Sequence, residues 1–171
     1  MRSVPSLAVP RVLVVPATEM KSIMSTMIRG DSQLPHGLAI RWEKQARHFE
    51  TKVRFNALCG LRVITWTDQS VVMVLPHAEQ LCNSTDGLHG GVVAALADTC
   101  GTAASLAAIG AEGFIATVSM NISYLAAATT DLTATGVCIK PGGRIQVSEV
   151  RVRDASDRLV AEAIVTSMLP G

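Results

Sequence analysis

The sequence predicts an α+β fold in which one long helix packs on a curved antiparallel sheet. Residues 89–111 form a nearly uncharged run that closes at Gly110 and Gly113, which is typical of a buried helix. Two stretches rich in Val and Ile come before this run, and four strand-like stretches separated by turn residues follow it. This order of elements contains no internal repeat and indicates one domain built around a single long helix.

The composition supports one compact domain. The chain has 171 residues, which is enough to bury a sizeable core. Apolar residues make up 49% and charged residues 17%, against a usual charged share of roughly 25%, so disordered and fibrous classes are excluded. The net charge is +1, so neither nucleic acid nor an anionic membrane surface is expected as a partner.

The cysteines and histidines are scattered along the chain without a CxxC pair or another ligand spacing, so no metal site is expected. They are Cys59, Cys82, Cys100 and Cys138, with His36, His48, His77 and His89. Free thiols of this kind are typical of a reducing compartment, which predicts a cytoplasmic protein.

Residues 1–40 are expected to be a poorly ordered extension, and residues 41–171 the folded domain. The first segment has three spaced prolines and no sustained hydrophobic period. Its apolar stretch 12–15 follows Arg11 and lies between prolines, which argues against the apolar core of a signal peptide.

An amphipathic helix is predicted over residues 41–55. Trp42, Ala46, Phe49 and Val53 recur at spacings of four, three and four, with charges on the other positions. The two strands of a hairpin are then predicted over 61–67 and 70–75, separated by Asp68 and Gln69 and ended by Pro76.

The central run contains one formally charged residue, Asp98. A membrane span of about 20 uniformly apolar residues is disfavoured, because the run also contains glycine and hydroxyl side chains. On a helical wheel one side is small with polar points, formed by Gly91, Ala94, Ala95, Asp98, Thr102 and Ser105. The opposite side carries Val92, Leu96, Thr99, Ala103 and Leu106. The small side suits a subunit interface or a narrow pocket, whereas a buried Asp98 satisfied by a hydroxyl such as Thr102 is the structural alternative.

Four consecutive strands are predicted after the helix, over 114–125, 131–140, 144–153 and 158–169. The second and third are joined by Pro141-Gly142-Gly143, and the third and fourth by residues 154–157. Turn residues at these positions are typical of an antiparallel meander.

Gly90 and Gly91 precede the helix, where unpaired N–H groups and the helix dipole favour negative charge. They could form an oxyanion hole, although a plain turn is the alternative. Asn83 lies six residues before His89, and Asp98 lies eight residues beyond Gly90. We expect one loop and two helical turns to bring a donor, an oxyanion site and a carboxylate together.

Residues 83–98, NSTDGLHGGVVAALAD, resemble the signature of hotdog-fold thioesterases of the phenylacetate-pathway (PaaI-like) type. TVSMNISYLAAA, residues 117–128, is similar to the strand that follows the central helix in that family, and residues 150–169 resemble its last hairpin. The resemblance spans about residues 58–169. It implies a central helix wrapped by a curved sheet, in a dimer or dimer of dimers whose active sites lie between subunits.

Carried over by position, the resemblance makes Asp98 the nucleophile or general base and Gly90 the backbone donor to the thioester carbonyl. Asn83 would orient the thioester or the water, and Thr117 would come from the partner subunit to help hold the water. His89 is a further candidate, either catalytic or shaping the loop.

Gly91 at the helix start and Thr102 on its small side are further expected substrate contacts. For the phosphates of coenzyme A the candidates are Lys140 and Arg144, with Arg151 and Arg153. The chain departs from the family at residues 124–128, YLAAA, where an aromatic residue is commonly followed, one residue on, by Arg-Pro or Ser-Pro.

The leading hypothesis is therefore hydrolysis of an acyl-CoA thioester to the free acid and coenzyme A, without a metal or redox cofactor. One alternative is a non-catalytic acyl-CoA-binding module or sensor, although the first forty residues are too short and irregular for an added DNA-binding domain. The other is a hydratase or dehydratase of the same fold, in which His89 would act.

Overall fold

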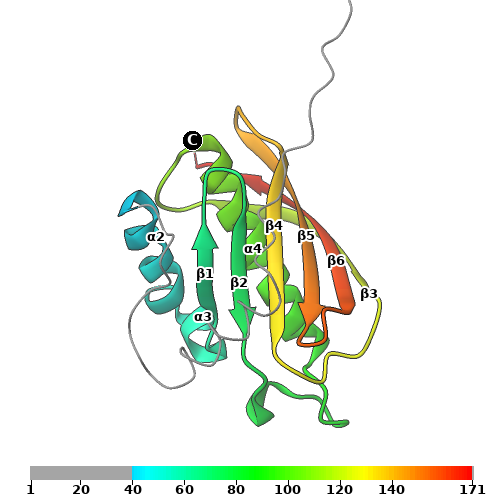
Figure 1. The fold of residues 1–171 in the computed structure, drawn as a ribbon. Coiled ribbons are helices and arrows are strands. Elements are labelled where there is room, and N and C mark those ends of the chain that lie inside the picture. The colour runs from blue at the N-terminus through cyan, green and yellow to red at the C-terminus, as the bar shows by residue number, and fades with distance from the viewer. Residues whose placement is uncertain (1–39, 171) are drawn as a thin grey trace, which may run out of the picture.

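A computed structural model describes residues 40–170 (Figure 1). Two short helices, α2 and α3, precede strands β1 and β2, a 3-10 turn η1 and the long helix α4, and strands β3 to β6 complete the chain. The bounds are α2 Ile40–Thr51, α3 Arg54–Cys59, β1 Arg62–Trp66, β2 Val71–Leu75, η1 Glu79–Leu81, α4 Gly90–Ile109, β3 Ala116–Tyr124, β4 Leu132–Lys140, β5 Ile145–Asp154 and β6 Leu159–Met168. The predicted α+β hotdog fold is confirmed, and the expectation for residues 1–39 lies outside the described residues.

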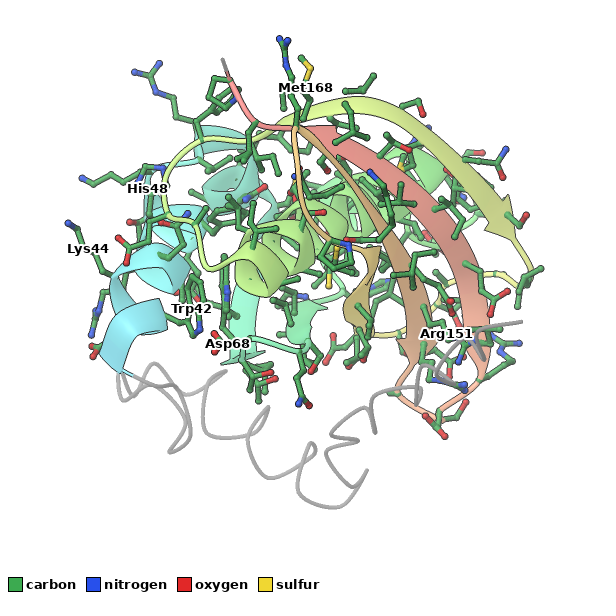
Figure 2. The ribbon with its side chains drawn as sticks, turned by 90° about the horizontal axis from the view of Figure 1, so that it is seen from above. Trp42, Lys44, His48, Asp68, Arg151 and Met168 are labelled. Carbon is green, nitrogen blue, oxygen red and sulfur yellow. The ribbon has the colours of Figure 1, made fainter. Side chains whose placement is uncertain are left out.

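The six strands form one antiparallel sheet in the order β1-β2-β4-β5-β6-β3. Seen from above, the sheet curves around α4 (Figure 2). Strand β3 pairs only with β6 among the described strands, so its other edge is free. The segment after β3 must therefore cross the end of the sheet, past β6 and β5, to reach β4.

Helix α4 packs closely on the sheet because glycine occupies both sides of the contact. A Cβ atom on Gly101 would lie 2.7 Å from Val165, and one on Gly136 would lie 2.8 Å from the carbonyl oxygen of Cys100. The helix is long and apolar enough to cross a membrane, but 61% of its most apolar window is buried inside the fold. It is therefore the core helix of this domain.

The N-terminal helix covers the β1 end of the sheet. The rings of Trp42 and Trp66 stack at 5.6 Å between centroids, and Phe49 meets Trp66 edge-on at 5.2 Å. The predicted stripe is thus buried at Trp42, Ala46 and Phe49. Such aromatic contacts add to the burial of apolar area and fix α2 against the sheet.

The prediction of one continuous helix over 41–55 is wrong. The helix ends at Thr51, and Val53, with ψ of 97°, separates α2 from α3. The Asn56 side chain turns back and donates to the Phe49 carbonyl over 3.0 Å. This contact satisfies a carbonyl at the end of α2, so the chain can change direction at little cost.

Candidate active site

The start of α4 is fixed by two side chains. His89 is the N-cap, and its Nδ1 accepts a hydrogen bond from the Gly91 N–H over 3.0 Å. The Tyr124 hydroxyl, from the end of β3, donates to the Gly90 carbonyl over 3.0 Å. The peptide between Gly90 and Gly91 is therefore held at both its oxygen and its nitrogen. Because Nδ1 accepts, a neutral His89 carries its proton on Nε2.

This geometry corrects the expectation for Gly91. Its N–H is engaged by His89, so it does not serve as a second oxyanion donor. Gly90 is the first residue of the helix, where the N–H has no helical partner. Within residues 40–170 no other acceptor is found for it. Gly90 alone therefore offers a main-chain donor at this position.

Asn83 is oriented by its own turn. Its Oδ1 accepts from both the N–H and the hydroxyl of Thr85, over 2.8 and 2.7 Å, while its N–H donates to the Gly87 carbonyl over 2.7 Å. Since Oδ1 is occupied by two donors, the Nδ2 group remains to donate outward. The Asn83 side chain is thus a prepared hydrogen-bond donor.

A cavity of about 290 Å³ lies between Asn83, Gly90 and Tyr124. Its remaining lining is mostly small and apolar, formed by Leu88, Val93, residues 126–129 and Val160, with Thr85 and Gly87. We call residues 126–129 the alanine wall, since three of the four are alanine. Concave apolar sites with a few convergent polar groups are the usual form of small-ligand sites.

Asp98 lies farther along the same helix. Its Oδ1 accepts a hydrogen bond from the Thr117 hydroxyl over 2.7 Å. Asp98 is half-buried and Thr117 is exposed, so the pair is accessible from outside the chain. Thr117 was expected to come from the partner subunit, but the structure makes this contact within one chain.

The small side of the helical wheel is not one continuous surface. Thr102 is buried, and its hydroxyl bonds the carbonyls of Asp98 and Thr99 in its own helix over 3.0 and 2.9 Å. Ser105 is buried against Ser148 of β5, with 2.8 Å between the hydroxyl oxygens. Thr102 is therefore not positioned as the expected substrate contact, because the sheet covers this half of the helix.

Gly90 and Asp98 are not brought together within one chain. Eight residues of α-helix separate them by a rise of about 12 Å. Tyr124 contacts the helix at Gly90 and Thr117 contacts it at Asp98, so the two groups mark opposite ends of β3. A single thioester carbonyl cannot lie within hydrogen-bonding distance of both.

The chain is similar to known proteins. The family model for the thioesterase superfamily matches residues 87–161, which run from the loop before α4 into β6. A Halobacterium salinarum protein provisionally named an esterase is 32% identical over 108 residues, which cover 60% of this chain and 72% of that protein. The chain belongs to the thioesterase superfamily.

Solved structures agree with this membership. A thioesterase-superfamily protein of Bordetella is 29% identical with a TM-score of 0.70, covering 77% of this chain and all of that one. A Haemophilus influenzae thioesterase shares the fold at 21% identity, with a TM-score of 0.64 over 80% of this chain and 94% of that one. Membership places the chain among thioester hydrolases.

The four basic candidates of this thioesterase-superfamily chain differ in what they contact. The Lys140 ammonium donates to the Ile145 carbonyl over 2.9 Å. Arg144, on the connection between β4 and β5, is exposed. Arg151 pairs with Glu149 and Glu162, and Arg153 pairs with Asp157. Lys140 and Arg144 lie at the end of the sheet that holds Thr117, since Ile145 and Ala116 both pair with Met168.

Three of the four thiols are affected by burial. Burial raises the pKa of Cys100 to about 12 and also raises the pKa of Cys59 and Cys138. Within residues 40–170 no three His, Cys, Asp or Glu side chains gather as a metal site.

Two residues near the cavity were not among the sequence-based candidates. Tyr124 holds the Gly90 carbonyl, and Arg158 donates to the Ala127 carbonyl over 2.8 Å. The one signal in the sequence was the departure from the family pattern at residues 124–128. It pointed to this segment, but not to Arg158, which lies 31 positions beyond Ala127.

Proposed function

We propose that this thioesterase-superfamily protein hydrolyses an acyl-CoA thioester to a free acid and coenzyme A. The observation that carries the proposal is the pair of contacts that β3 makes with α4. One holds a carboxylate at Asp98, and the other holds the peptide that follows the free Gly90 N–H. Acyl transfer requires a base or nucleophile together with a donor for the developing oxyanion.

In the proposed reaction the thioester carbonyl oxygen accepts from the Gly90 N–H, whose position at the helix start adds a favourable dipole. Because Gly90 and Asp98 of one chain lie too far apart, the acting carboxylate is the partner's Asp98, which either takes a proton from an attacking water or attacks the carbonyl itself. When water attacks, the C–S bond breaks and the leaving thiolate takes up the proton held by the carboxylate. When the carboxylate attacks, the C–S bond breaks to leave an acyl anhydride, water hydrolyses this anhydride to the free acid, and the proton left on the carboxyl group passes to the thiolate. Asn83 donates through Nδ2 to orient the substrate, and Thr117 fixes the carboxylate through its hydrogen bond.

The free edge of β3 supports a site built from two subunits. If two β3 strands pair antiparallel about a twofold axis near Met120 and Asn121, Thr117 of one chain lies opposite the partner's Tyr124. The Asp98 end of one helix would then face the Gly90 end of the other. This pairing would also cover Val118, which is 55% exposed in the single chain.

The test is thiol release from short, medium, long and aromatic acyl-CoA thioesters by the unmodified protein and by Asp98→Asn. We expect the substitution to lower kcat by about 10²–10⁴-fold, because the amide can act neither as base nor as nucleophile. Circular dichroism and thermal unfolding check that the fold is kept. Activity of Asp98→Asn within a few-fold of the unmodified protein would overturn the role of Asp98.

The same measurement covers the sensor hypothesis. Tight binding of acyl-CoA with no thiol release from any thioester would show a binding module instead of an enzyme. Turnover that depends on Asp98 would exclude that reading.

A further inference from the structure

The alanine wall is positioned by groups outside the candidate catalytic residues. It belongs to the segment between β3 and β4, which passes the β5–β6 turn at the end of the sheet. The Ala155 N–H of that turn donates to the Thr130 hydroxyl over 3.1 Å, so the two segments are joined at their surface. The turn can therefore influence the shape of the cavity.

Several main-chain polar groups around the wall are paired within the protein. The Leu125 and Ala126 N–H groups both point to the Val160 carbonyl, over 2.9 and 3.3 Å. The Ala128 carbonyl accepts from the Leu88 N–H over 2.8 Å. The Ala127 carbonyl accepts from Arg158 Nη2 over 2.8 Å, which is the one contact of this set made by a side chain.

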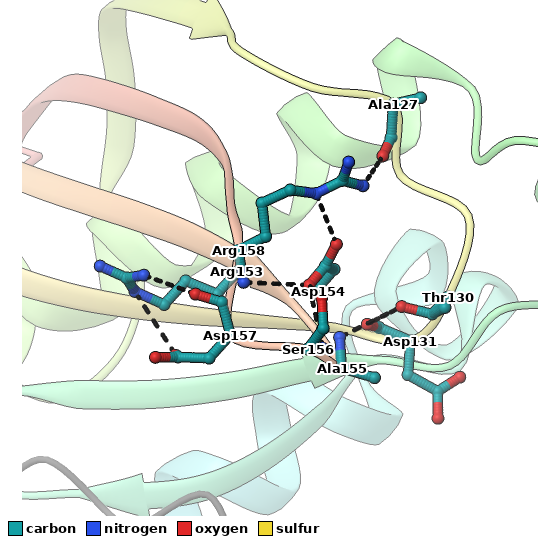
Figure 3. A network of polar contacts seen from close by, with 9 residues as sticks. All are labelled: Ala127, Thr130, Asp131, Arg153, Asp154, Ala155, Ser156, Asp157 and Arg158. Atoms are coloured by element: carbon teal, nitrogen blue, oxygen red, sulfur yellow. Dashed lines mark hydrogen bonds and ion pairs between the residues drawn. The ribbon is translucent and has the colours of Figure 1, made fainter.

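Arg158 is itself held by Asp154 (Figure 3). Its Nε donates to Asp154 Oδ2 over 2.9 Å, while Asp154 Oδ1 accepts from the N–H and hydroxyl of Ser156 and from the Arg158 N–H. The Asp154 side chain is only 5% exposed. The hydrogen bond from the Ser156 hydroxyl, with the other donors, lowers the pKa of this carboxyl. Asp154 therefore fixes the orientation of the guanidinium that donates to the Ala127 carbonyl.

Beside Asn83, Gly90 and Tyr124 the cavity lining is mostly aliphatic, with Leu88, Val93, Val160 and the three alanines of the wall. An apolar acyl group loses nothing there and gains burial. At about 30 Å³ for each water-sized unit, 290 Å³ holds a group of about ten non-hydrogen atoms.

We propose that Arg158 is a positioning residue that fixes the alanine wall, and that the cavity takes a small apolar acyl group. The inference rests on the proposed thioester hydrolysis. In this proposal Arg158 contacts neither the thioester carbonyl nor the attacking water. It acts on the cavity through its hydrogen bond to the Ala127 carbonyl.

The experiment compares Arg158→Met with Arg47→Met in the full chain. Methionine keeps an unbranched apolar stem and removes the donors. Arg47 is the matched control, because it is a similarly exposed arginine that pairs with a carboxylate four positions away, Glu43 of α2, and is not among the candidate substrate contacts. Both variants are assayed with acetyl-, octanoyl-, phenylacetyl- and palmitoyl-CoA, and KM and kcat are measured separately.

We expect the unmodified protein to prefer octanoyl- or phenylacetyl-CoA over palmitoyl-CoA. In Arg158→Met, KM for the preferred substrates should rise about tenfold while kcat changes less than threefold, because the wall loses its place but the catalytic groups do not. The preference over palmitoyl-CoA should fall by a similar factor. Arg47→Met should keep the unmodified pattern. A general loss of folding would lower the active fraction, and so kcat, equally for all four substrates.

Calorimetric binding of non-hydrolysable octanoyl- and palmitoyl-CoA thioethers separates this inference from the proposed function. Absence of turnover in the unmodified protein would overturn the proposed function, while the ratio of the two thioether affinities would still report on the wall. An unchanged ratio in Arg158→Met, or equal changes in both variants, would overturn the inference.

Discussion

At one end of β3 the Thr117 hydroxyl donates to the Asp98 carboxylate, whereas at the other end the Tyr124 hydroxyl donates to the Gly90 carbonyl. Strand β3 therefore contacts helix α4 at two points, and the two contacts orient different groups. The first contact orients a negative charge that can take a proton. The second orients a peptide at a helix start, where negative charge is favoured.

The surroundings of the two contacts also differ. The Gly90 end opens into the cavity with the alanine wall and is braced by the Asp154 and Arg158 network. The Asp98 end has an exposed threonine and lies at the sheet end that carries Lys140 and Arg144. Under the proposed function, the Gly90 end would hold the apolar acyl group and the oxyanion, and the Asp98 end would supply the base and the basic side chains for phosphates.

The helix separates these functions by about 12 Å, which no side-chain rearrangement within one chain removes. In the proposed dimer each chain therefore contributes two different half-sites. If two chains pair along the free edge of β3, as proposed, the Asp98 half of each chain would meet the Gly90 half of the other, and two sites would be completed at once.

The first prediction tests the Gly90 half. Gly90→Pro removes the N–H at the first helical position, where proline fits the helix and the preceding His89 is already extended at ψ of 135°. We expect kcat to fall by about 10²–10³-fold, the usual effect of losing one oxyanion donor. Steady-state thiol release measures it.

Gly90→Ala is the control for this substitution. It keeps the N–H, and its Cβ would meet the Tyr124 ring at 3.5 Å, an ordinary contact. It should remain within a few-fold of the unmodified protein. Equal losses in the alanine and proline variants would assign the effect to space at the helix start instead of to the donor.

The second prediction joins the two halves. Coexpression of Asp98→Asn with Gly90→Pro should give mixed dimers in which one of the two sites has both groups intact. Random pairing predicts recovery of about a quarter of the unmodified activity from two nearly inactive chains. Coexpression of Asp98→Asn with Asp98→Ala, which damages the same half twice, should recover nothing. No recovery in the first mixture would refute a site shared between chains.

Much of the fold could be predicted because its signals are local. The closing glycine of the central run, Gly110, adopts the left-handed conformation expected at a helix end, with φ of 63°. The turns at residues 141–143 and 154–157 separate strands whose bounds the sequence predicted to within about two residues. Local chemistry was also sufficient to single out Asn83, Gly90 and Asp98.

Tertiary contacts decided what the sequence could not. A helical wheel separates small from large side chains but does not say which side the sheet covers, so Thr102 and Ser105 were placed with Asp98. The break between α2 and α3 depends on Asn56 reaching the Phe49 carbonyl. Arg158 reaches Ala127 across 31 positions, and neither residue type announces that contact.

The third prediction tests the network of Asp154 and Arg158 through the pH dependence of stability. The lowered pKa of Asp154 means that its stabilisation is complete above its ordinary pKa near 3.9 and is lost as the pH falls through the folded-state value. Asp154→Asn should lower the free energy of unfolding by about 2 kcal/mol at pH 7, because hydrogen bonds to a buried charge are lost.

The difference in Tm between Asp154→Asn and the unmodified protein should narrow as the pH falls from 5 to 3. Asp157→Asn is the control, since that side chain is 73% exposed and pairs with Arg153 at 3.8 Å. It should change Tm by less than about 1 °C, as expected for an exposed pair. If the difference in Tm between Asp154→Asn and the unmodified protein stayed constant down to pH 3, stabilisation by the ionised Asp154 carboxylate would be contradicted.

The smallest expected effect concerns Tyr124. Tyr124→Phe keeps the ring beside Gly90 and removes only the hydrogen bond to its carbonyl. Losing one hydrogen bond that orients the Gly90 peptide should raise the activation free energy by about 1 kcal/mol, so kcat should fall about fivefold. Steady-state thiol release measures kcat. An unchanged kcat in Tyr124→Phe would show that the hydrogen bond from Tyr124 does not position the Gly90 peptide for the reaction.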